Sequence, residues 1–449
     1  MVTVSLSKLS SSHCFCFSFS FWHITYLSSI FWIAAYLHHS LFHFSTSTTL
    51  LLPSADDPCS GRYIYIHNLP SLFNSDILSD YLNVNLSYTN MCRFISNSGL
   101  GPPLTNHSII SSSALYSTDP YSLDLIFHNR IKHYHCLTTN SSLSSAIFIP
   151  FYAGLDFGRY QWDYNISVRD SLPIQLAHWL SSTPEWHVLG GRDHFMVAGR
   201  TTWDFRRFKD EDNLWGNKLL LLPEMHNIST LVFESDPWDS NDIAIPYPTY
   251  FHPSNHTELV SWQDRVRGLE RQWLFAFAGA PRLSSDSIRE QVINQCRASA
   301  KCNLLECGSG LSECHSPVSI MALFESASFC LQPPGDTPTR KSVFDAMVSG
   351  CVPVFFDRRT AYDQYTWYLP REHEKYSVFI EEEEVRRGEV SIEKVLSEYS
   401  EKQVRAMREE VVRLIPRLIY GDPRSRPEGF KDAVDVAVDG VLRRVGRLT

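Results

Sequence analysis

The sequence predicts an α/β fold of two facing lobes, because strands and helices alternate along the chain in two separate series. The chain has 449 residues, too many for one ordinary core and enough for two domains of roughly 150 to 200 residues. Hydrophobic residues make up 43% and charged residues 20% of the chain, a composition typical of folded globular proteins. We therefore expect parallel sheets covered by helices, with a cleft between the lobes.

An N-terminal appendage, residues 1–58, is predicted to precede the folded part. No Asp, Glu, Lys or Arg occurs at positions 9–55, and the apolar stretch 15–37 has the length of a membrane span. Lys8 precedes this stretch and two aspartates follow it, which favours a cytoplasmic N-terminus. A cleaved signal peptide is the alternative. The polar residues 40–54 would form a stem, and the rest of the chain would be lumenal.

Glycosylation acceptors and cysteines agree with a lumenal location. The acceptors of the pattern Asn-X-Ser/Thr are Asn85, Asn106, Asn140, Asn165, Asn227 and Asn255. Of the eleven cysteines, Cys14 and Cys16 fall in the predicted anchor, and the odd number that remains leaves at least one free thiol. The net charge of −9 offers no basic surface, so we exclude nucleic acid as a partner.

The two series divide the folded part at residues 258 and 259. In the first series, residues 59–258, strands are predicted at 62–67, 145–150, 218–222 and 230–233, and a helix at 170–180. In the second series, residues 259–449, helices are predicted at 259–271, 285–299 and 339–349, and strands at 273–278, 328–331 and 351–356. The charged, helical residues after 400 are expected to pack without taking part in chemistry.

The most informative segment is a compact strand, loop, helix and strand at residues 329–356. Thr337 can cap its helix, and Pro338 suits the first helical position. The helix N-terminus then opens onto the loop around Gly335, at the carboxyl end of a strand, where α/β sheets bind ligands. A diphosphate fits this position, and Arg340 would add positive charge to neutralise the leaving group.

Three further residues of this helix are candidates for donor binding, and two of them could instead form an ion pair. Lys341 could add a second positive charge for the diphosphate, Ser342 follows it, and Asp345 could accept hydrogen bonds from ribose hydroxyls. Alternatively, Lys341 and Asp345 lie four residues apart and could form an ordinary surface ion pair. The spacing by itself favours neither interpretation.

This segment resembles the donor-site signature of the exostosin-like family, glycosyltransferase family 47. From about Cys59 to Arg447, the remaining chain resembles the plant xyloglucan galactosyltransferase branch of that family. The matching segments are 61–66 (GRYIYI), 126–130 (IFHNR), 148–154 (FIPFYAG), 191–195 (GRDHF), 198–207 (AGRTTWDFRR), 215–223 (WGNKLLLLP), 245–253 (IPYPTYFHP) and 413–420 (RLIPRLIY).

The resemblance implies a GT-B fold, an inverting reaction and a UDP-sugar donor held by the C-terminal lobe, with no obligatory metal and no cofactor. The donor residues it implies are Gly335, Asp336, Thr339, Arg340, Lys341, Ser342 and Asp345. The chain departs from the family pattern where Lys341 replaces a second Arg, which would lose bidentate phosphate geometry. Thr337-Pro338 replaces a more usual Ser-Tyr, and the N-terminal segment is unusually hydrophobic.

The first series supplies candidates for the acceptor side of the reaction. Inverting transfer needs a base within hydrogen-bond reach of the attacking hydroxyl, and Asp193 and His194 are the first candidates. His194 is also a candidate for a buried structural histidine. Tyr152, Asp156 and Trp203 could contact the acceptor sugar, although aromatic residues beside strand ends often belong to the core.

The cysteines and acidic runs of the second series suggest no metal site. Cys296, Cys302, Cys307 and Cys314 have gaps that do not fit the usual zinc pairs, so disulfides are favoured, with three pairings open. The acidic run 381–384 suits a solvated loop better than a Mg²⁺ site.

The sequence therefore predicts a type II Golgi membrane enzyme that transfers galactose from UDP-galactose to a xylosyl side chain of xyloglucan. A galacturonosyl or arabinosyl transferase is the alternative within the same class. A non-catalytic glycan-binding partner of such an enzyme is the alternative from another class. Complexes with other Golgi glycosyltransferases are a further expectation.

Overall fold

The computed structural model describes residues 57–83, 91–104, 113–161, 164–281, 287–308 and 312–447. The chain divides into two compact units, residues 1–60 and 61–449, and the architecture below belongs to the second. Within the described ranges, no helix combines the length and the apolar character needed to cross a membrane. The anchor predicted at 15–37 lies outside the described residues, as do the acceptors Asn85 and Asn106.

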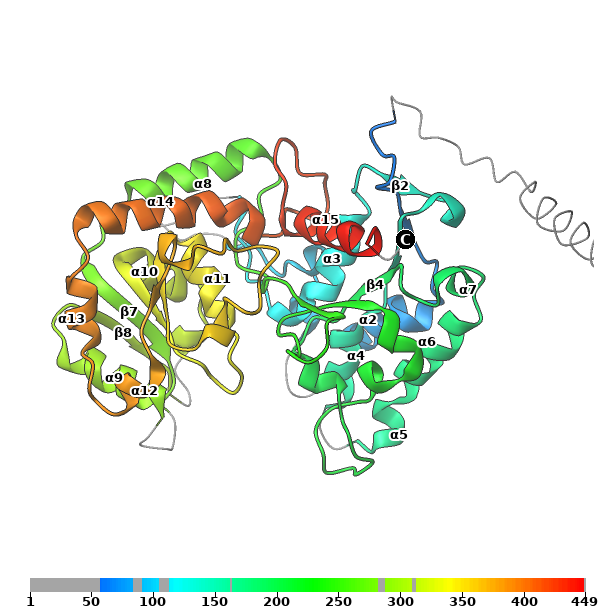
Figure 1. Cartoon of the computed structure of the whole chain (residues 1–449), viewed down its shortest axis with the longest axis horizontal. Helices are drawn as coiled ribbons and strands as arrows, with labels where there is room; N and C mark the ends of the chain where they lie inside the picture. The colour runs from blue at the N-terminus through cyan, green and yellow to red at the C-terminus, as the bar shows by residue number, and fades with distance from the viewer. Residues whose placement is uncertain are drawn as a thin grey trace, which may run out of the picture. The chain divides into compact units, whose positions relative to one another are not determined.

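The first lobe (Figure 1) is built on a sheet that contains six strands, and every neighbouring pair of these strands is parallel. The strand order is β2-β1-β3-β4-β5-β6. The strands are β1 (Ile64–Ile66), β2 (Leu137–Thr138), β3 (Ala146–Ile149), β4 (His194–Val197), β5 (Ser229–Val232) and β6 (Asp242–Ala244). All residues of β3, β4 and β5 are buried, because helices cover both faces of the sheet.

Short helices surround this sheet. They are α2 (Ser75–Asn83), α3 (Leu123–Ile131), α4 (Ala153–Tyr160), α5 (Ile166–Arg169), α6 (Ser171–Ser181) and α7 (Trp186–Leu189). The core between helices and sheet is aromatic, with Phe73, Phe151 and Phe157 almost wholly buried.

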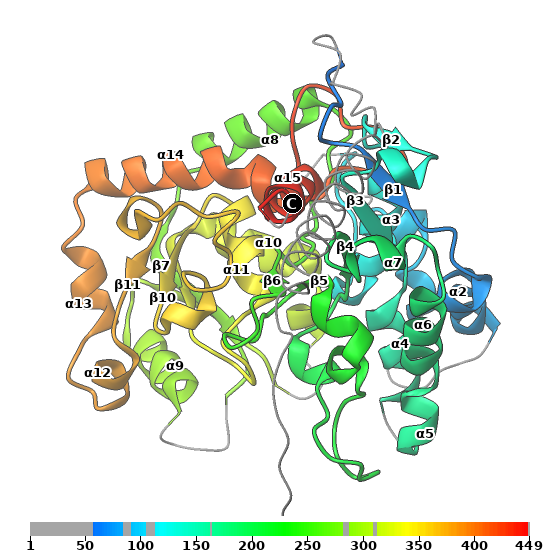
Figure 2. The same cartoon turned by 45° about the vertical axis from the view of Figure 1, so that its right-hand side comes forward.

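The second lobe is built on a five-stranded parallel sheet with the order β11-β10-β9-β7-β8. Its strands are β7 (Trp273–Gly279), β8 (Cys302–Glu306), β9 (Ala327–Gln332), β10 (Val352–Phe355) and β11 (Val378–Phe379). Its helices are α8 (His256–Gly268), α9 (Ile288–Ala298), α10 (Pro317–Ser326), α11 (Lys341–Val348), α12 (Glu382–Arg386), α13 (Ile392–Ser397) and α14 (Glu401–Leu418). Helices α8 and α14 run side by side along this lobe in both views (Figure 2).

The last helix, α15 (Ala433–Val445), packs against α3 and β3 of the first lobe as well as against α14 of the second. Arg130 of α3 donates to Asp432 Oδ2 at 2.8 Å and to Asp435 Oδ2 at 2.8 Å. Asp432 is fully buried and also caps α15 by accepting hydrogen bonds from Val434 and Asp435 N–H groups. A buried ion cluster therefore fixes the C-terminal helix to the first lobe.

Two all-parallel sheets flanked by helices confirm the predicted two-lobed α/β class. One predicted strand, 218–222, is wrong, because Leu219–Leu221 forms a 3₁₀ turn. Asn217 Oδ1 accepts from Leu219 N–H, and Asp170 Oδ1 accepts from Lys218 N–H. These side-chain bonds occupy the backbone donors that a strand would offer to its neighbour.

Candidate functional site

Residues 333–340, which we call the donor loop, join the carboxyl end of β9 to α11. Helix α11 begins at Lys341, and Arg340 lies at its N-cap in an extended conformation. The prediction that Thr337 caps this helix and that Pro338 takes its first position is therefore wrong. The helix starts at Lys341, three residues after Pro338, and its first turn carries Lys341 and the residues that follow.

Contacts with the first lobe explain the late start of α11. The N–H and the hydroxyl of Thr339 both donate to Glu234 Oε2, at 2.8 and 2.7 Å, and the Tyr247 hydroxyl lies 3.1 Å from Thr339 Oγ1. Glu234 follows the carboxyl end of β5. The donor loop is thus tied to the first lobe, whereas its Asp336 is exposed.

A cavity of about 510 Å³ lies beside the first turn of α11. Ala278, Gly279 and Cys307, at the carboxyl ends of β7 and β8, line it, as does Tyr250. Four of the predicted donor residues line the same cavity: Arg340, Lys341, Ser342 and Asp345. A helix N-terminus beside the carboxyl ends of parallel strands is a favourable position for a phosphate-bearing ligand. We call this space the donor cavity.

Gly335 marks the point where two guanidinium groups approach the donor loop. A Cβ atom at this position would lie 2.5 Å from Arg289 Nη2 and 2.6 Å from Arg340 Nη1, so a larger residue would displace these guanidinium groups. Arg289 comes from α9, far from the donor loop in sequence. Two guanidinium groups at one glycine create a positive potential that suits a diphosphate.

Lys341 and Asp345 form the ion pair that their spacing allowed, but the pair is buried instead of lying on the surface. Lys341 Nζ lies 2.8 Å from both oxygens of Asp345 and 3.4 Å from the centroid of the Tyr250 ring. Burial, the largest effect, lowers the pKa of Lys341, but Asp345 and Tyr250 outweigh it and the pKa is raised. Lys341 therefore carries its charge inside the cavity wall, already balanced by Asp345. Next to it, Ser342 donates to Gln332 Oε1 at 2.6 Å.

A second cavity, of about 1150 Å³, is lined by both lobes. Trp203 lines it and is 54% exposed, so the position of this side chain fits its predicted contact with the acceptor. Glu234 and Pro338 also line this cavity. The second cavity therefore extends to the donor loop.

The structure does not bring Asp193 and His194 to either of these cavities. Both lie at the amino end of β4, whereas Glu234 and the donor loop meet at the carboxyl end of the same sheet. His194 is fully buried, with Nδ1 2.8 Å from Asp193 Oδ1 and Nε2 3.1 Å from His67 Nε2. Burial, with a contribution from His194, lowers the pKa of His67 to about 4. Asp193 and His194 therefore lie away from both cavities, and the burial of His194 fits the alternative of a structural histidine.

Tyr152 and Asp156 also lie away from any acceptor surface. The Tyr152 hydroxyl lies 2.8 Å from His128 Nδ1, and the residue is 4% exposed. Asp156 is 2% exposed, and its Oδ1 accepts from Arg159 at 2.5 Å. Burial, opposed by Arg159, raises the pKa of Asp156 to about 6. These two predicted acceptor contacts are corrected to core positions, because a sugar could not reach either side chain.

The cysteines of the second lobe are paired as disulfides, which confirms the preference for disulfides over zinc. The pairs are Cys296–Cys302, Cys307–Cys314 and Cys330–Cys351. Among the described residues Cys92 is a free and exposed cysteine, in agreement with the odd count.

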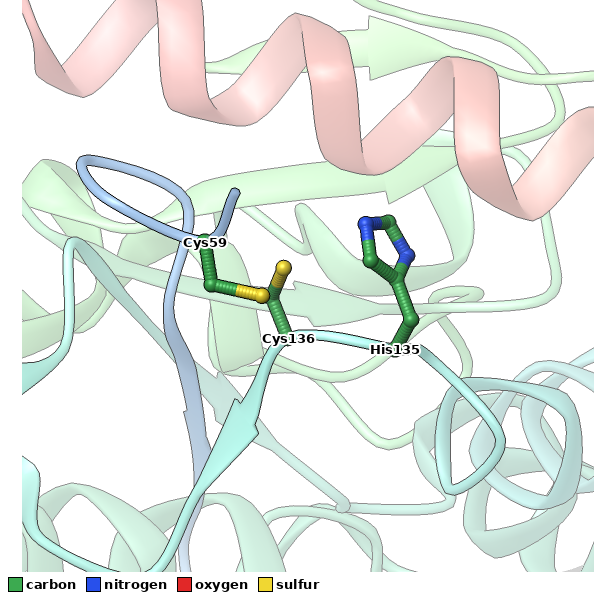
Figure 3. A group of neighbouring side chains, drawn as sticks. All are labelled: Cys59, His135 and Cys136. Carbon is green, nitrogen blue, oxygen red and sulfur yellow. The ribbon is translucent and has the colours of Figure 1, made fainter. Parts of the chain in front are cut away.

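Figure 3 shows three side chains with potential metal-binding atoms, Cys59, His135 and Cys136. Both cysteines are disulfide-bonded and so have no thiolate for a metal. The acidic run 381–384 lies at the start of the short helix α12, where Glu381, Glu383 and Glu384 are exposed.

Several side chains at the two cavities and at the donor loop were not predicted. Glu234 directly follows the predicted strand 230–233, so the strand-end argument applied to the donor loop could have found it. Arg289 and Tyr250 carry no such signal, since they come from a helix and a connecting segment far from the donor loop in sequence.

Comparison with known proteins identifies the family. The family model described as the exostosin GT47 domain matches residues 58–396. Xyloglucan galactosyltransferase MUR3 of Arabidopsis thaliana is 56% identical over 394 residues, covering 87% of this chain and 64% of that protein. Xyloglucan galactosyltransferase XLT2 of the same plant is 43% identical, covering 87% of this chain and 76% of that protein. Xyloglucan-specific galacturonosyltransferase 1, also of Arabidopsis thaliana, is 39% identical, covering 87% of this chain and 58% of that protein.

Among solved structures, a glycosyltransferase from Rickettsia africae ESF-5 aligns with 86% of this chain and 99% of its own, at 8% identity and a TM-score of 0.31. The present chain spans about two thirds of the length of the MUR3 relative. A family model that covers most of the described chain, together with relatives of this identity, confirms the resemblance noted in the sequence. The chain belongs to the exostosin GT47 family of glycosyltransferases.

Proposed function

We propose that this protein transfers galactose from UDP-galactose to xyloglucan, with inversion at the anomeric carbon. The observation that carries the proposal is the donor cavity, where Arg340, Ser342 and Asp345 line a space beside the first turn of α11. A diphosphate would lie at that turn against the guanidinium groups of Arg340 and Arg289. The relatives named as xyloglucan galactosyltransferases support galactose as the sugar and xyloglucan as the acceptor.

In an inverting displacement, the acceptor oxygen attacks the anomeric carbon, the bond to the diphosphate breaks, and UDP leaves with the electron pair. Arg340 and Arg289 would stabilise the charge that develops on the leaving diphosphate. The attacking hydroxyl loses a proton, which requires a base. The geometry favours Glu234 over the residues predicted from the sequence.

Three carboxylates line the larger cavity: Glu234, Asp236 and Asp363. Glu234 hydrogen-bonds the donor loop through one oxygen, Oε2, whereas Asp236 pairs with Arg206 at 3.8 Å. We infer that Glu234 accepts the proton, because it lies where the acceptor-facing cavity meets the donor loop.

A panel of donors tests the proposed reaction. The purified full-length chain is incubated with galactose-free xyloglucan and, separately, with UDP-galactose, UDP-galacturonate and UDP-arabinose. We expect a β-galactosyl product with UDP-galactose alone. Turnover with UDP-galacturonate alone would show that the donor sugar is galacturonate instead of galactose. The name of one relative suggests this donor class. UDP binding without any turnover would support the non-catalytic alternative.

The Glu234→Gln variant tests the base. Glutamine keeps an oxygen that can accept from Thr339 but lacks the basicity of a carboxylate, so kcat should fall by about 10²-fold or more. The affinity for UDP should stay within about twofold, since the donor cavity is unchanged. Asp193→Asn is the matched control at the other end of the sheet and should keep its kcat. The opposite pattern for the two variants would restore Asp193 as the base.

We propose a Golgi membrane location with a lumenal catalytic domain. Disulfides in the second lobe and exposed acceptors at Asn140, Asn165 and Asn227 support an oxidising, secretory compartment. Asn255 differs, because it is half-buried, whereas the other three acceptors are exposed. Mass spectrometry of peptides from the plant-expressed chain should find glycans on the three exposed acceptors and none on Asn255.

A further inference from the structure

The larger cavity gathers exposed aromatic side chains. Trp203, Phe208, Trp215 and Trp238 line it, with exposed fractions of 54%, 79%, 41% and 93%. Among the described residues, Tyr164 is the one other aromatic side chain that is similarly exposed. We call these four residues and the cavity they line the aromatic cleft. Folded proteins rarely leave large aromatic rings in water at one place unless a ligand covers them.

Two of these side chains have positions set by neighbouring structure. Trp215 Nε1 donates to Asp204 Oδ1 at 2.6 Å, and its ring meets the edge of Phe157 with centroids 5.4 Å apart. Trp238 follows a turn in which Asp236 Oδ1 accepts from its N–H at 2.9 Å. The Trp215 indole and the Trp238 backbone are therefore held in place, while both rings stay exposed to solvent.

Flat aromatic faces bordered by polar groups match the chemistry of sugars. A β-linked glucose ring carries its hydroxyls equatorially and presents C–H groups on its faces, so its faces stack on aromatic rings and its hydroxyls bond polar neighbours. Ser235 and Gln364, which bond each other across the lobes at 2.8 Å, are such polar neighbours in the cleft.

The charge of the aromatic cleft favours neutral glycans over acidic ones. Its lining holds four basic and three acidic side chains. Three of the basic ones are already paired: Arg206 with Asp242 at 2.7 Å, Arg207 with Asp170 at 2.5 Å and Arg359 with Asp357 at 2.5 Å. A nearly neutral lining of this kind gives no attraction for a polyuronate, whose many carboxylates would need unpaired cations.

The size and position of the cleft indicate a chain of sugars. The volume of about 1150 Å³ exceeds the roughly 300 to 1000 Å³ typical of sites for single small molecules. Pro338 of the donor loop and Glu234 line the same space, so a glycan in the cleft would lie beside the donor.

We propose that the aromatic cleft binds several consecutive units of a neutral β-linked glucan main chain, stacked on Trp203, Phe208 and Trp238. This inference rests on the proposed function, and it adds which part of the acceptor the protein recognises. The main chain is held by the cleft, and the side chain that receives the sugar extends toward the donor loop.

Calorimetric titration of the full-length chain with cello-oligosaccharides of two to six units tests the proposal. Affinity should rise with each added unit until the cleft is filled. Trp203→Ala and Trp238→Ala should each weaken binding of the longest oligosaccharide by about 10-fold. Tyr164→Ala removes an exposed aromatic ring outside the cleft and should leave binding unchanged. Thermal unfolding of each variant verifies that it is folded.

Three results would overturn the inference: affinity that does not depend on length, tryptophan variants that bind like the parent, or tighter binding of an oligogalacturonide. UDP affinity and slow hydrolysis of UDP-galactose, measured on the same variants, separate this inference from the proposed function. Loss of glucan binding with unchanged donor hydrolysis supports the cleft. Normal glucan binding in a parent chain that transfers no sugar would refute the reaction and leave the cleft standing.

Discussion

At the scale of single residues, the donor cavity depends on charges that are buried in pairs. The side chains of Lys341 and Asp345 are 17% and 4% exposed, and they lie 2.8 Å apart. A buried carboxylate that loses its partner pays the full desolvation cost, whereas a surface pair contributes little. A buried pair of Lys341 and Asp345 and a surface pair therefore differ in how much stability the protein loses when one partner is removed.

Lys341→Met should lower the free energy of unfolding by about 3 to 5 kcal/mol, because Asp345 would stay buried without a counter-charge. Urea unfolding followed by circular dichroism measures this change. Arg386→Met, which breaks an exposed pair with Glu383, is the matched control and should cost under about 1 kcal/mol. Equal effects of the two variants would show that the Lys341 pair behaves like a surface pair.

The sequence predicted the residues that one local unit brings together and missed those that distant segments supply. Arg340, Lys341, Ser342 and Asp345 follow from a single strand, loop and helix, and all four line the donor cavity. Asp193 and His194 were chosen from a separate matching segment, and the structure places them at the amino end of β4, away from the donor cavity.

At the scale of elements, the unit β9-α11-β10 is closed by a covalent link. Cys330 in β9 and Cys351 directly before β10 are both fully buried and joined as a disulfide across 21 positions. This link restricts the unfolded chain around the helix that carries the donor residues. The unit that was easiest to predict from the sequence is thus also cross-linked.

Replacing both Cys330 and Cys351 by alanine should lower the free energy of unfolding by about 2 to 4 kcal/mol. Chemical unfolding under oxidising conditions measures the loss. Cys92→Ala removes an exposed, unpaired cysteine and should change stability by less than about 0.5 kcal/mol. A double variant as stable as the parent would mean that the disulfide adds nothing to the fold.

The segment that links the lobes carries a buried histidine. His252 Nδ1 lies 2.8 Å from Tyr420 O, and Nε2 lies 2.9 Å from Thr118 Oγ1 and 2.9 Å from Thr249 O. Burial, opposed by the two backbone hydrogen bonds, lowers the pKa of His252 to about 4. The unfolded chain therefore takes up this proton first as the pH falls.

The stability that neutral His252 contributes should be present above about pH 6.5 and lost between about pH 6.5 and pH 4. The difference in unfolding free energy between the parent and His252→Gln should change by about 3 kcal/mol over this range. Denaturation curves of both proteins at several pH values measure this difference. If the unfolding free energies of the two proteins depend on pH in the same way, the pKa of His252 does not differ between the folded and unfolded states.

At the scale of the whole molecule, the C-terminal helix α15 contacts the first lobe, from which it is far apart in the sequence. The predicted division at residues 258 and 259 assigns α15 to the second lobe, and α15 packs against α14 of that lobe as well as against α3 and β3 of the first. Arg62 and Arg130 of the first lobe both pair with acidic residues of this C-terminal region. The C-terminal end of the chain therefore returns to the first lobe and contacts both lobes.

Arg130→Met should destabilise the protein by about 3 to 5 kcal/mol, because it leaves the fully buried Asp432 without a cation. Hydrogen exchange should show the largest loss of protection in α15 and α3. Lys431→Ala removes an exposed partner of Asp439 and should change neither quantity appreciably. Uniform exchange in the Arg130 variant would argue against a local role for this cluster.

The central claim is that the donor cavity beside α11 holds the nucleotide sugar. A crystal structure of the full-length chain with UDP tests it most directly. The claim predicts density for the diphosphate between Arg340 and the first turn of α11, with the uridine inside the cavity lined by Asp345 and Tyr250. UDP bound at any other place, with this cavity empty, would contradict it.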